Sequence, residues 1–297
     1  MPELPEVETV RRSLHALIVG KTIQDVSVLL PRIIRTPDDI QQFIQLLKGR
    51  TVQKVDRRGK YLLIHFDEGQ TLVSHLRMEG KYGLYQSSEP VELHTHVRFF
   101  FTDGMELRYR DVRQFGTMDF VSTGDYRAIP GLHGIGVEPL DDALTVRQFR
   151  NALIRKHTTI KAALLDQSCI AGLGNIYVDE SLFLSGIHPE RQVSTLKAKQ
   201  FADLYTSVRT ILANAVAAGG SSVKSYVNGY GTSGQFQHQL LVYGKQGTAC
   251  PHCGHVIEKL RVAGRGTHIC PNCQPKPRNY GSNVRKKSRQ KQTPMEG

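Results

Sequence analysis

The chain opens with a helical pattern of apolar and polar positions. Between residues 5 and 18, apolar side chains recur at the three- and four-residue spacing of an amphipathic helix, at Val7, Val10, Leu14, Leu17 and Ile18. Pro5 suits the first turn of a helix, where a backbone N–H has no partner to lose. The pattern therefore predicts a helix that begins almost at the terminus and pins that terminus against a folded body.

From about residue 21 to residue 123 the pattern changes to short β-rich runs. Glycines and Asp-Gly turns separate these runs, which read TIQDVSVLL, RTVQKVDRR, KYLLIHF, TLVSHLRM, HVRFFFTD, MELRYRD and GTMDFV. Many short strands at close spacing are typical of an antiparallel sandwich or barrel. We expect residues 1–130 to form one domain, built from the N-terminal helix and an antiparallel β-sandwich.

A linker rich in glycine and proline follows at residues 131–142, and the helical period returns after it. Within the helical part, the segment QSCIAGLGN (167–175) is too short and too rich in glycine to be a helix. Two helices joined by two tight turns fit it, so we expect residues 143–242 to form a helix–two-turn–helix domain. A Gly- and Ser-rich stretch at 219–237 predicts a mobile loop. The predicted fold class is thus α+β with two domains.

Four of the five cysteines stand in two Cys-X-X-Cys pairs with sixteen residues between them: Cys250 with Cys253, and Cys270 with Cys273. This spacing is typical of a zinc ribbon, in which four thiolates bind one tetrahedral ion. Two disulfides are the alternative, although the intracellular character of the chain argues against them. His252 or His255 could also replace a thiolate. We expect one structural Zn²⁺ in a ribbon at residues 243–273.

The charge balance indicates a polyanionic partner. The chain carries 39 Lys and Arg against 27 Asp and Glu, a formal net charge of +12. Residues 274–297 hold seven of these cations, one acid and almost nothing apolar, which predicts a disordered basic tail. The chain stays basic without the tail, and nucleic acid is the simplest partner for it.

The same composition argues against a membrane protein. No apolar run approaches the ~20 residues that cross a bilayer. The acidic start of the chain, MPELPEVETV, lacks the cations and the apolar core of a secretory signal. We therefore expect a cytosolic protein without a membrane partner.

The terminus itself carries candidate chemistry. Pro2 is small, so Met1 is normally removed, which leaves a secondary amine beside Glu3 and Glu6. An α-amino group has a pKa of about 7.7–8.0, so part of it is neutral and nucleophilic near pH 7. Its addition to a sugar C1′ gives a cationic iminium that acts as an electron sink, while the carboxyl groups move protons. An ordinary capped helix with surface glutamates explains the same residues.

Four separate motifs resemble the formamidopyrimidine-DNA glycosylase (Fpg, MutM) family. They are PELPEVET at the start, DVRQFG at 111–116, QSCIAGLGNIYVDE at 167–180, and the terminal zinc ribbon. The resemblance covers about residues 1–273. It implies a bifunctional enzyme of base excision repair, a glycosylase on oxidised purines (8-oxoguanine and formamidopyrimidines) and a lyase that cuts the strand by β,δ-elimination. It also implies damaged double-stranded DNA as the partner, and we expect a monomer of the bacterial cytosol or nucleoid.

The resemblance implies roles for the candidate catalytic residues. Pro2 is the Schiff-base nucleophile, Glu3 the general acid and base at the sugar, and Glu6 a supporting carboxylate. Lys60 acts in β-elimination and contacts phosphate. Arg265, at the tip of a hairpin between the two cysteine pairs, binds phosphate around the lesion and donates a proton in δ-elimination.

A trio of residues matches those that fill the void left by an everted base: Met78, Arg113 and Phe115. Base extrusion leaves unpaired hydrogen-bonding groups and a gap in the stack. An arginine can pair with the orphaned base, while apolar side chains wedge into the stack. Strand core is the alternative for Met78 and Phe115. Gln114 departs from the family pattern, since relatives often carry a basic residue there.

Three further residues match contacts to DNA phosphates: His94, Asn175 and Lys156. Asn175 begins a predicted helix, whose N-terminus suits an anion. A plain surface histidine and simple helix capping are the alternatives for His94 and Asn175. His157 competes with Lys156 for the aligned position, and Lys161 could add another phosphate contact.

Two other hypotheses remain at this point. Endonuclease VIII shares the fold and the terminal proline but prefers oxidised pyrimidines, and it typically opens PEGPE, whereas Leu4 fills that glycine position here. A non-catalytic zinc-ribbon protein that only binds DNA would not need Pro2, Glu3, Glu6 and Lys60 together.

Overall fold

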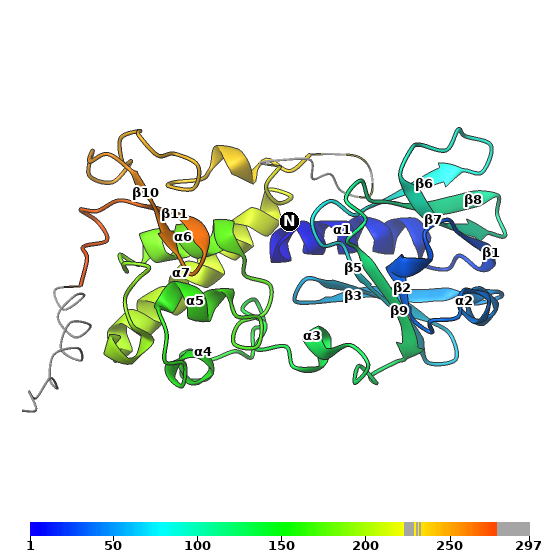
Figure 1. The fold of residues 1–297 in the computed structure, drawn as a ribbon, viewed down its shortest axis with the longest axis horizontal. Coiled ribbons are helices and arrows are strands. Elements are labelled where there is room, and N and C mark those ends of the chain that lie inside the picture. The colour runs from blue at the N-terminus through cyan, green and yellow to red at the C-terminus, as the bar shows by residue number, and fades with distance from the viewer. Residues whose placement is uncertain (223–228, 230, 232, 278–297) are drawn as a thin grey trace, which may run out of the picture.

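The computed structural model describes residues 1–222, 229, 231 and 233–277, and it separates a β-rich half from a helical half (Figure 1). The α+β class predicted from the sequence is confirmed. Residues 223–228, 230 and 232 of the predicted mobile loop, and all of the predicted basic tail beyond residue 277, lie outside the described residues. Among the described residues, none of the helices combines the length and the apolar character that a membrane span requires.

Two sheets form the β-rich half, and all of their residues are described. In spatial order, the four-stranded sheet contains β1 (Ile23–Val28), β7 (Thr95–Phe101), β8 (Met105–Arg110) and β6 (Lys81–Gln86). The five-stranded sheet contains β2 (Ile34–Thr36), β9 (Thr117–Ser122), β5 (Gln70–His75), β4 (Tyr61–Phe66) and β3 (Val52–Arg58). Neighbouring strands are antiparallel except β2 and β9, which run parallel. The arrangement is therefore a sandwich with one short parallel edge strand.

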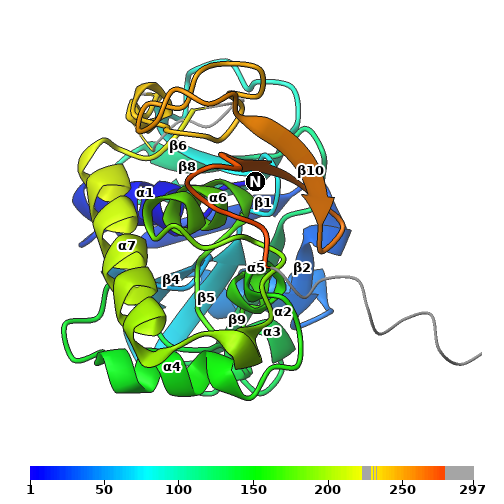
Figure 2. The same ribbon diagram turned by 90° about the vertical axis from the view of Figure 1, so that its left-hand side faces the viewer.

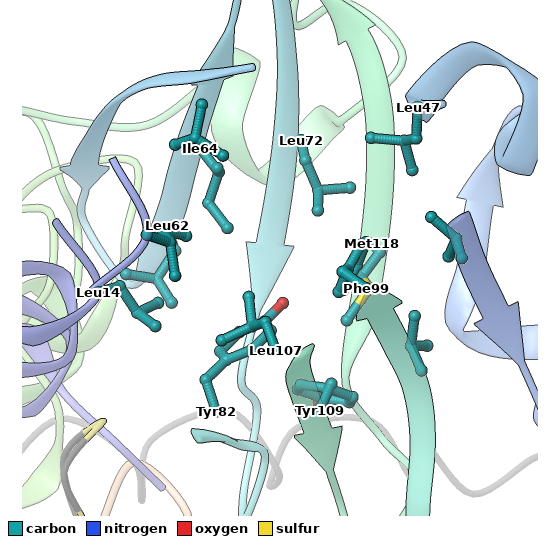
Figure 3. Packing of buried hydrophobic residues seen from close by; sticks show 14 of the residues in the cluster. Leu14, Leu47, Leu62, Ile64, Leu72, Tyr82, Phe99, Leu107, Tyr109 and Met118 are labelled. Atoms are coloured by element: carbon teal, nitrogen blue, oxygen red, sulfur yellow. The ribbon is translucent and has the colours of Figure 1, made fainter. Parts of the chain in front are cut away.

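The inner faces of the two sheets share one hydrophobic core (Figure 3). Leu62 and Leu72 from the five-stranded sheet lie in the same cluster as Leu107 and Tyr109 from β8. The short helix α2 (Ile40–Leu47) adds Phe43 and Leu47 to this core. Alternation along the strands places one set of apolar side chains in this core, whereas Leu63 and Val73, on the other face of the five-stranded sheet, pack against Ile129 and Leu132.

Helix α1 (Leu4–Ile18) connects the two halves. The N-terminus lies at their junction, and α1 runs from there into the β-rich half (Figure 1). Val7, Val10 and Leu14 belong to the core of the sandwich, whereas Leu4 belongs to the core of the helical half. One amphipathic helix therefore contributes to two hydrophobic cores.

The helical half contains four helices that pack around a second core and one short helix in the linker, all within described residues. They are α3 (Pro130–His133), α4 (Val146–Ile154), α5 (Ile160–Leu165), α6 (Asn175–Leu184) and α7 (Ala198–Ala217). Residues 166–174 join α5 to α6 as turns, which is the predicted helix–two-turn–helix connection. Cys169 is buried in this second core, as expected for a small apolar residue.

The C-terminal hairpin of β10 (Glu258–Val262) and β11 (Arg265–Ile269) lies against α6 (Figures 1 and 2). Gln274 extends the ordered chain past the boundary at Cys273 that the composition suggests. Its side chain is completely buried, donates to the carbonyl of Ile187 at 3.0 Å and accepts the N–H of Cys270 at 3.1 Å. A polar residue in a basic segment carries no sequence signal for such a contact.

Replacement of Leu4 tests the connection between the two halves. Leu4→Ala removes a completely buried side chain and should lower the free energy of unfolding by about 2–5 kcal/mol. Urea denaturation measures the loss. Leu29→Ala is the matched control, because Leu29 is 75% exposed and its truncation should cost less than about 0.5 kcal/mol. Equal losses in the two variants would show that α1 does not join the halves in this way.

Candidate active site

The start of α1 lies against the segment that precedes α6. The N–H of Leu4 donates to the carbonyl of Gly172 at 3.0 Å. A Cβ atom on Gly172 would lie 2.6 Å from the Leu4 side chain, and one on Gly174 would lie 2.3 Å from the Glu3 carboxyl carbon. Only glycine permits this approach, so the glycines of the motif bring the chain terminus against the end of α6.

Glu3 lies at the N-terminus of α6. Its carboxylate accepts the backbone N–H of Ile176 at 3.1 Å and that of Tyr177 at 3.5 Å, where the helix dipole favours negative charge. Burial nevertheless raises the pKa of Glu3 to about 7, although the positive charge of Lys60 opposes the rise. A carboxyl group with this pKa is both a proton donor and a proton acceptor near neutral pH.

Three donors among the described residues hold the oxygens of Glu6. It accepts the N–H of Glu3 at 2.8 Å, the N–H of Ser221 at 2.7 Å and the hydroxyl of Tyr177. Burial raises its pKa above the ordinary value. Tyr177 and Ser221 were not predicted from the sequence, since nothing in their local pattern points to α1.

Lys60 lies beside the N-terminal end of α6 and is 5% exposed. Its ammonium donates to the carbonyl of Leu173 at 2.7 Å. Burial lowers the pKa of Lys60, the charges of Glu3 and Glu6 oppose this change, and the charge of Arg265 reinforces it. The side chain is thereby brought closer to the neutral form that can accept a proton.

Pro2 is buried, and the exposed Met1 borders a cavity of about 470 Å³ beside Lys60. Polar and charged side chains line much of this cavity: Arg35, Lys60, Tyr61, His75, Arg77, Asp119 and Gln167. The surplus of cations at the cavity suits an anion such as a phosphate. Except for Lys60, these residues were missed in the sequence, because single polar residues at strand ends give no periodic signal.

His75 is held neutral in this cavity. Burial, together with the positive charges of Arg77 and Lys60, lowers its pKa to about 3. Its Nδ1 accepts the N–H of Arg77 at 2.9 Å, which leaves Nε2 to carry the proton of the neutral ring. His75 therefore offers a hydrogen-bond donor without adding a charge.

The two loops that carry Met78, Arg113 and Phe115 leave the same end of neighbouring strands. His75, the last residue of β5, pairs with Thr117, the first residue of β9. Arg113 and Phe115 are exposed, with the guanidinium 5.0 Å from the ring centroid, and Met78 is half-buried. These exposures agree with side chains that contact a partner rather than with strand core.

Asp111 fixes the loop that carries Arg113 and Phe115. Its carboxylate accepts the backbone N–H of Arg113 at 3.1 Å, of Phe115 at 2.9 Å and of Gly116 at 2.8 Å. Asp111 is completely buried, so water does not compete for these bonds. The loop is therefore shaped before any partner arrives.

The candidate phosphate contacts differ in their surroundings. His94 is half-exposed, and Asn175 is the first residue of α6 and donates to the carbonyl of Gly266 at 2.9 Å. Lys156 is 39% exposed and forms an ion pair of 2.8 Å with Asp166. These three remain predictions.

The expectation that Lys161 contacts phosphate is wrong. Its side chain is completely buried in an ion pair of 2.6 Å with Asp179, and its ammonium also contacts the Thr267 hydroxyl at 2.8 Å. Asp179 in turn accepts the N–H of His268 at 2.9 Å. Lys161 therefore joins α5 and α6 to the C-terminal hairpin. The residues next to Lys161 in the sequence carry no signal for this buried contact.

Arg265 stands at the tip of that hairpin, as predicted. Ala263 and Gly264 both have positive φ, 50° and 72°, which is the conformation of a two-residue type I′ turn. Arg265 is exposed, and its positive charge contributes to the lowered pKa of Lys60. The hairpin thus places a guanidinium of the helical half within electrostatic reach of Lys60.

The four predicted cysteine ligands form one cluster, with their sulfur atoms all within 4.8 Å of one another. Cys250 and Cys273 are 3.9 Å apart, and Cys253 and Cys270 are 3.4 Å apart. Tetrahedral zinc with bonds of about 2.3 Å requires sulfur separations near 3.8 Å, whereas a disulfide requires about 2.05 Å. The cluster therefore fits one structural Zn²⁺ and excludes the disulfide alternative. His252 stacks on Phe183, with ring centroids 4.7 Å apart.

Three family models match the chain in order. The formamidopyrimidine-DNA glycosylase N-terminal domain matches residues 1–118, the H2TH domain of the same glycosylase matches 135–227, and the zinc finger found in FPG and IleRS matches 247–276.

Curated relatives and solved structures are similar over nearly the whole chain. The formamidopyrimidine-DNA glycosylase of Brevibacillus brevis is 56% identical over 274 residues, 92% of this chain and 99% of the relative. That of Shouchella clausii is 54% identical over 277 residues, 93% of this chain and 100% of the relative. A Lactococcus lactis FPG mutant with Fapy-dG containing DNA has a TM-score of 0.86 and 44% identity, covering 93% of this chain and 100% of its own. A complex of wild-type Lactococcus lactis Fpg with DNA containing an oxidised pyrimidine has a TM-score of 0.84 and 44% identity, over 93% and 100%.

The raised pKa of Glu3 makes a prediction about stability. A carboxyl whose pKa rises from 4.5 to about 7 on folding binds its proton more tightly in the folded state. Stability is therefore lost as the pH rises from about 4.5 to 7, and the deficit persists above that. Glu3→Gln cannot ionise, so it should be more stable than the wild type at pH 8, by up to about 3 kcal/mol, and by less than about 1 kcal/mol at pH 5.

Melting temperatures at the two pH values measure this difference. Glu258→Gln is the matched control, because Glu258 is exposed and its variant should follow the wild type at both values. A Glu3→Gln protein with the same or lower stability than the wild type at pH 8 would contradict the raised pKa.

Proposed function

The chain belongs to the formamidopyrimidine-DNA glycosylase family, as its four motifs predict, and from this premise we propose the reaction that its site performs. Enzymes of this family are DNA glycosylases and AP lyases. We infer that this enzyme releases oxidised purines from double-stranded DNA through a Schiff base at Pro2 and then cuts the strand by β,δ-elimination. The observation that carries the proposal is the burial of Glu3 and Lys60 beside the N-terminus, with the pKa of each shifted toward neutrality.

Base release begins with the amine of Pro2, once Met1 has been removed. The nitrogen of Pro2 bonds to C1′ of the damaged nucleotide, while the bond from C1′ to the base breaks. The departing base takes the electron pair and a proton. Glu3 is partly protonated near pH 7, because its pKa is about 7, so it can supply that proton. The Pro2 nitrogen loses its own proton as it bonds, so the first product is an aminal in which C1′ is still bonded to the ring oxygen O4′. The bond from C1′ to O4′ then breaks, O4′ takes a proton, and the nitrogen lone pair forms the double bond of an iminium ion at C1′.

Strand cleavage follows from the iminium, which withdraws electrons from C2′. Removal of a C2′ proton lets a double bond form between C2′ and C3′, and the bond from C3′ to the phosphate oxygen breaks. The lowered pKa of Lys60 supports a role for its amine in this step. A second elimination removes a C4′ proton and breaks the bond from C5′ to its phosphate oxygen. Arg265, which is exposed and whose charge lowers the pKa of Lys60, donates a proton to the departing phosphate.

The DNA contacts are proposed on the same premise. Exposed Arg113 and Phe115, with Met78, enter the space left by the everted base. His94, Asn175 and Lys156 bind phosphates.

The Zn²⁺ that the four thiolates would hold has no open coordination position for water. Its role is therefore to stabilise the ribbon rather than to supply a nucleophile.

Oxidised pyrimidines are a second candidate substrate class. The relative from Lactococcus lactis has been solved with DNA that contains one. The family assignment nevertheless favours purines, and Leu4 fills the position where endonuclease VIII typically carries glycine. The complete set of buried catalytic groups argues against a protein that only binds DNA.

Blocking the terminal amine tests the Schiff base. An N-terminal extension that precedes Pro2 should abolish base release and strand cleavage on an 8-oxoguanine duplex, and no covalent complex should form with borohydride. The matched control is the same protein after a protease has removed the extension to expose Pro2, which should regain all three activities. Normal cleavage by the extended protein would disprove the Pro2 assignment. Faster excision of an oxidised pyrimidine than of 8-oxoguanine by the control would favour the second substrate class.

Zinc removal tests the structural role of the ribbon. Cys250→Ser should weaken binding to an abasic-site duplex by about tenfold or more, because Arg265 is misplaced and a contact to a charged group contributes about 1.5–3 kcal/mol. Fluorescence anisotropy measures the affinity, and elemental analysis measures the bound zinc. Cys169→Ser serves as the control, since Cys169 lies in a different core. Full activity in a protein without bound zinc would contradict this role.

A further inference from the structure

The turn that carries Lys60 is held from outside its own domain. It connects β3 to β4, and the three residues before Lys60 all contact Glu138 of the linker. Both terminal nitrogens of Arg57 donate to Glu138 at 3.0 Å, and the backbone N–H of Gly59 donates to the same carboxylate. The guanidinium of Arg58 lies 3.4 Å from it.

These contacts are shielded from water, so they are stronger than ion pairs at the surface. The side chains of Arg57 and Glu138 are 10% and 14% exposed. Arg57 also donates to the carbonyl of Gly59 at 2.9 Å and to Glu8 of α1 at 3.3 Å. These bonds fix the geometry of the guanidinium, and loss of the Glu138 charge would leave Arg57 with Glu8, which it shares with Arg11 and Arg12.

The linker also controls the other end of Lys60. The N–H of Gly136 donates to the carbonyl of Gln167 at 2.8 Å, and the neighbouring Val137 pairs with Ile170. The side chain of Gln167 donates to the carbonyl of Leu173 at 2.8 Å. That carbonyl is the one that accepts the Lys60 ammonium.

Gly59 permits the close contact between the turn and this segment. Its φ is +55°, and a Cβ atom at this position would lie 2.3 Å from Ile135 and 3.6 Å from Ala171. The turn before Lys60 therefore lies directly against the linker and the segment that precedes α6.

We propose that Glu138 is a positioning residue for Lys60. It fixes residues 57–59, from which the Lys60 side chain departs, while the same linker segment fixes the carbonyl on which the ammonium ends. The inference rests on the proposed function, because it takes Lys60 to act in strand cleavage. Its consequence is that the linker sets the position of a reacting group in addition to connecting two domains.

The test is a double-mutant cycle on the complete protein. Glu138→Gln keeps the shape of the side chain and removes its charge, and Lys60→Met keeps the length of the lysine without its amine. The readouts are the single-turnover rate of strand cleavage on a saturating abasic-site duplex, the affinity for that duplex, and the melting temperature. A displacement of about 1 Å can cost about 100-fold in rate, so we expect Glu138→Gln to lose about tenfold in rate with little change in affinity.

The cycle separates positioning from general damage. If Glu138 acts through Lys60, Lys60→Met should be slower still, and the double variant should be as slow as Lys60→Met alone. Asp142→Asn is the matched control, because Asp142 lies in the same linker and pairs with Arg209 at 3.2 Å but is fully exposed. It should cleave at the wild-type rate.

Three outcomes would overturn the inference. The first is a wild-type cleavage rate for Glu138→Gln. The second is a double variant that is slower than Lys60→Met by the same factor by which Glu138→Gln is slower than the wild type, because the two effects would then be independent. A normal rate for Lys60→Met disproves the proposed role of Lys60 itself, and is thereby distinguished from a failure of Glu138 alone. If Glu138→Gln does not fold, Arg57→Lys takes its place in the cycle, since lysine keeps the charge but lacks the two-pronged contact to Glu138, and the same outcomes decide.

Discussion

Burial of charge between the two halves of the molecule is the constraint on which the site depends. Glu3 and Lys60 are 4% and 5% exposed, and withdrawal of a charged group from water costs several kcal/mol unless the protein replaces the lost hydrogen bonds. The helical half supplies the replacements, as backbone N–H groups of α6 for Glu3 and the Leu173 carbonyl for Lys60. Burial between the packed halves moves the pKa values of both groups toward neutrality, so the acid–base properties of the site depend on the contact between the two domains.

Backbone groups, rather than side chains, form the inner surface of that docking site. Gly172 and Gly174 leave room for Leu4 and Glu3, and Leu173 between them offers its carbonyl outward while its side chain fills the second core. Any larger residue at either glycine would push the start of α1 away from α6. The glycines of this motif are therefore better explained by the space that Leu4 and Glu3 need than by a need for flexibility.

The sequence was sufficient for the elements and for the residues whose neighbours along the chain carry the signal. The apolar spacing of α1, the β-rich runs and the paired cysteines are local patterns, and family motifs singled out Glu3, Lys60 and Arg265. Contacts between segments far apart in the chain could not be predicted from the sequence. Lys161 looks like an exposed lysine but is buried against Asp179, Gln274 resembles the tail that follows it, and Glu138 reads as one acid in a polar linker. The role of each residue depends on which distant residues the fold places beside it, and no spacing along the chain encodes those partners.

The loop held by Asp111 bears on how the protein meets a duplex. Three of its N–H groups are bound by one buried carboxylate before any encounter, so the conformational entropy of this backbone is lost during folding. An interface that must order its own loop spends part of its interaction energy on that ordering. If Phe115 and Arg113 enter the duplex as proposed, they do so from a backbone that is already ordered, so the resistance of the duplex rather than rearrangement of this loop would oppose their entry.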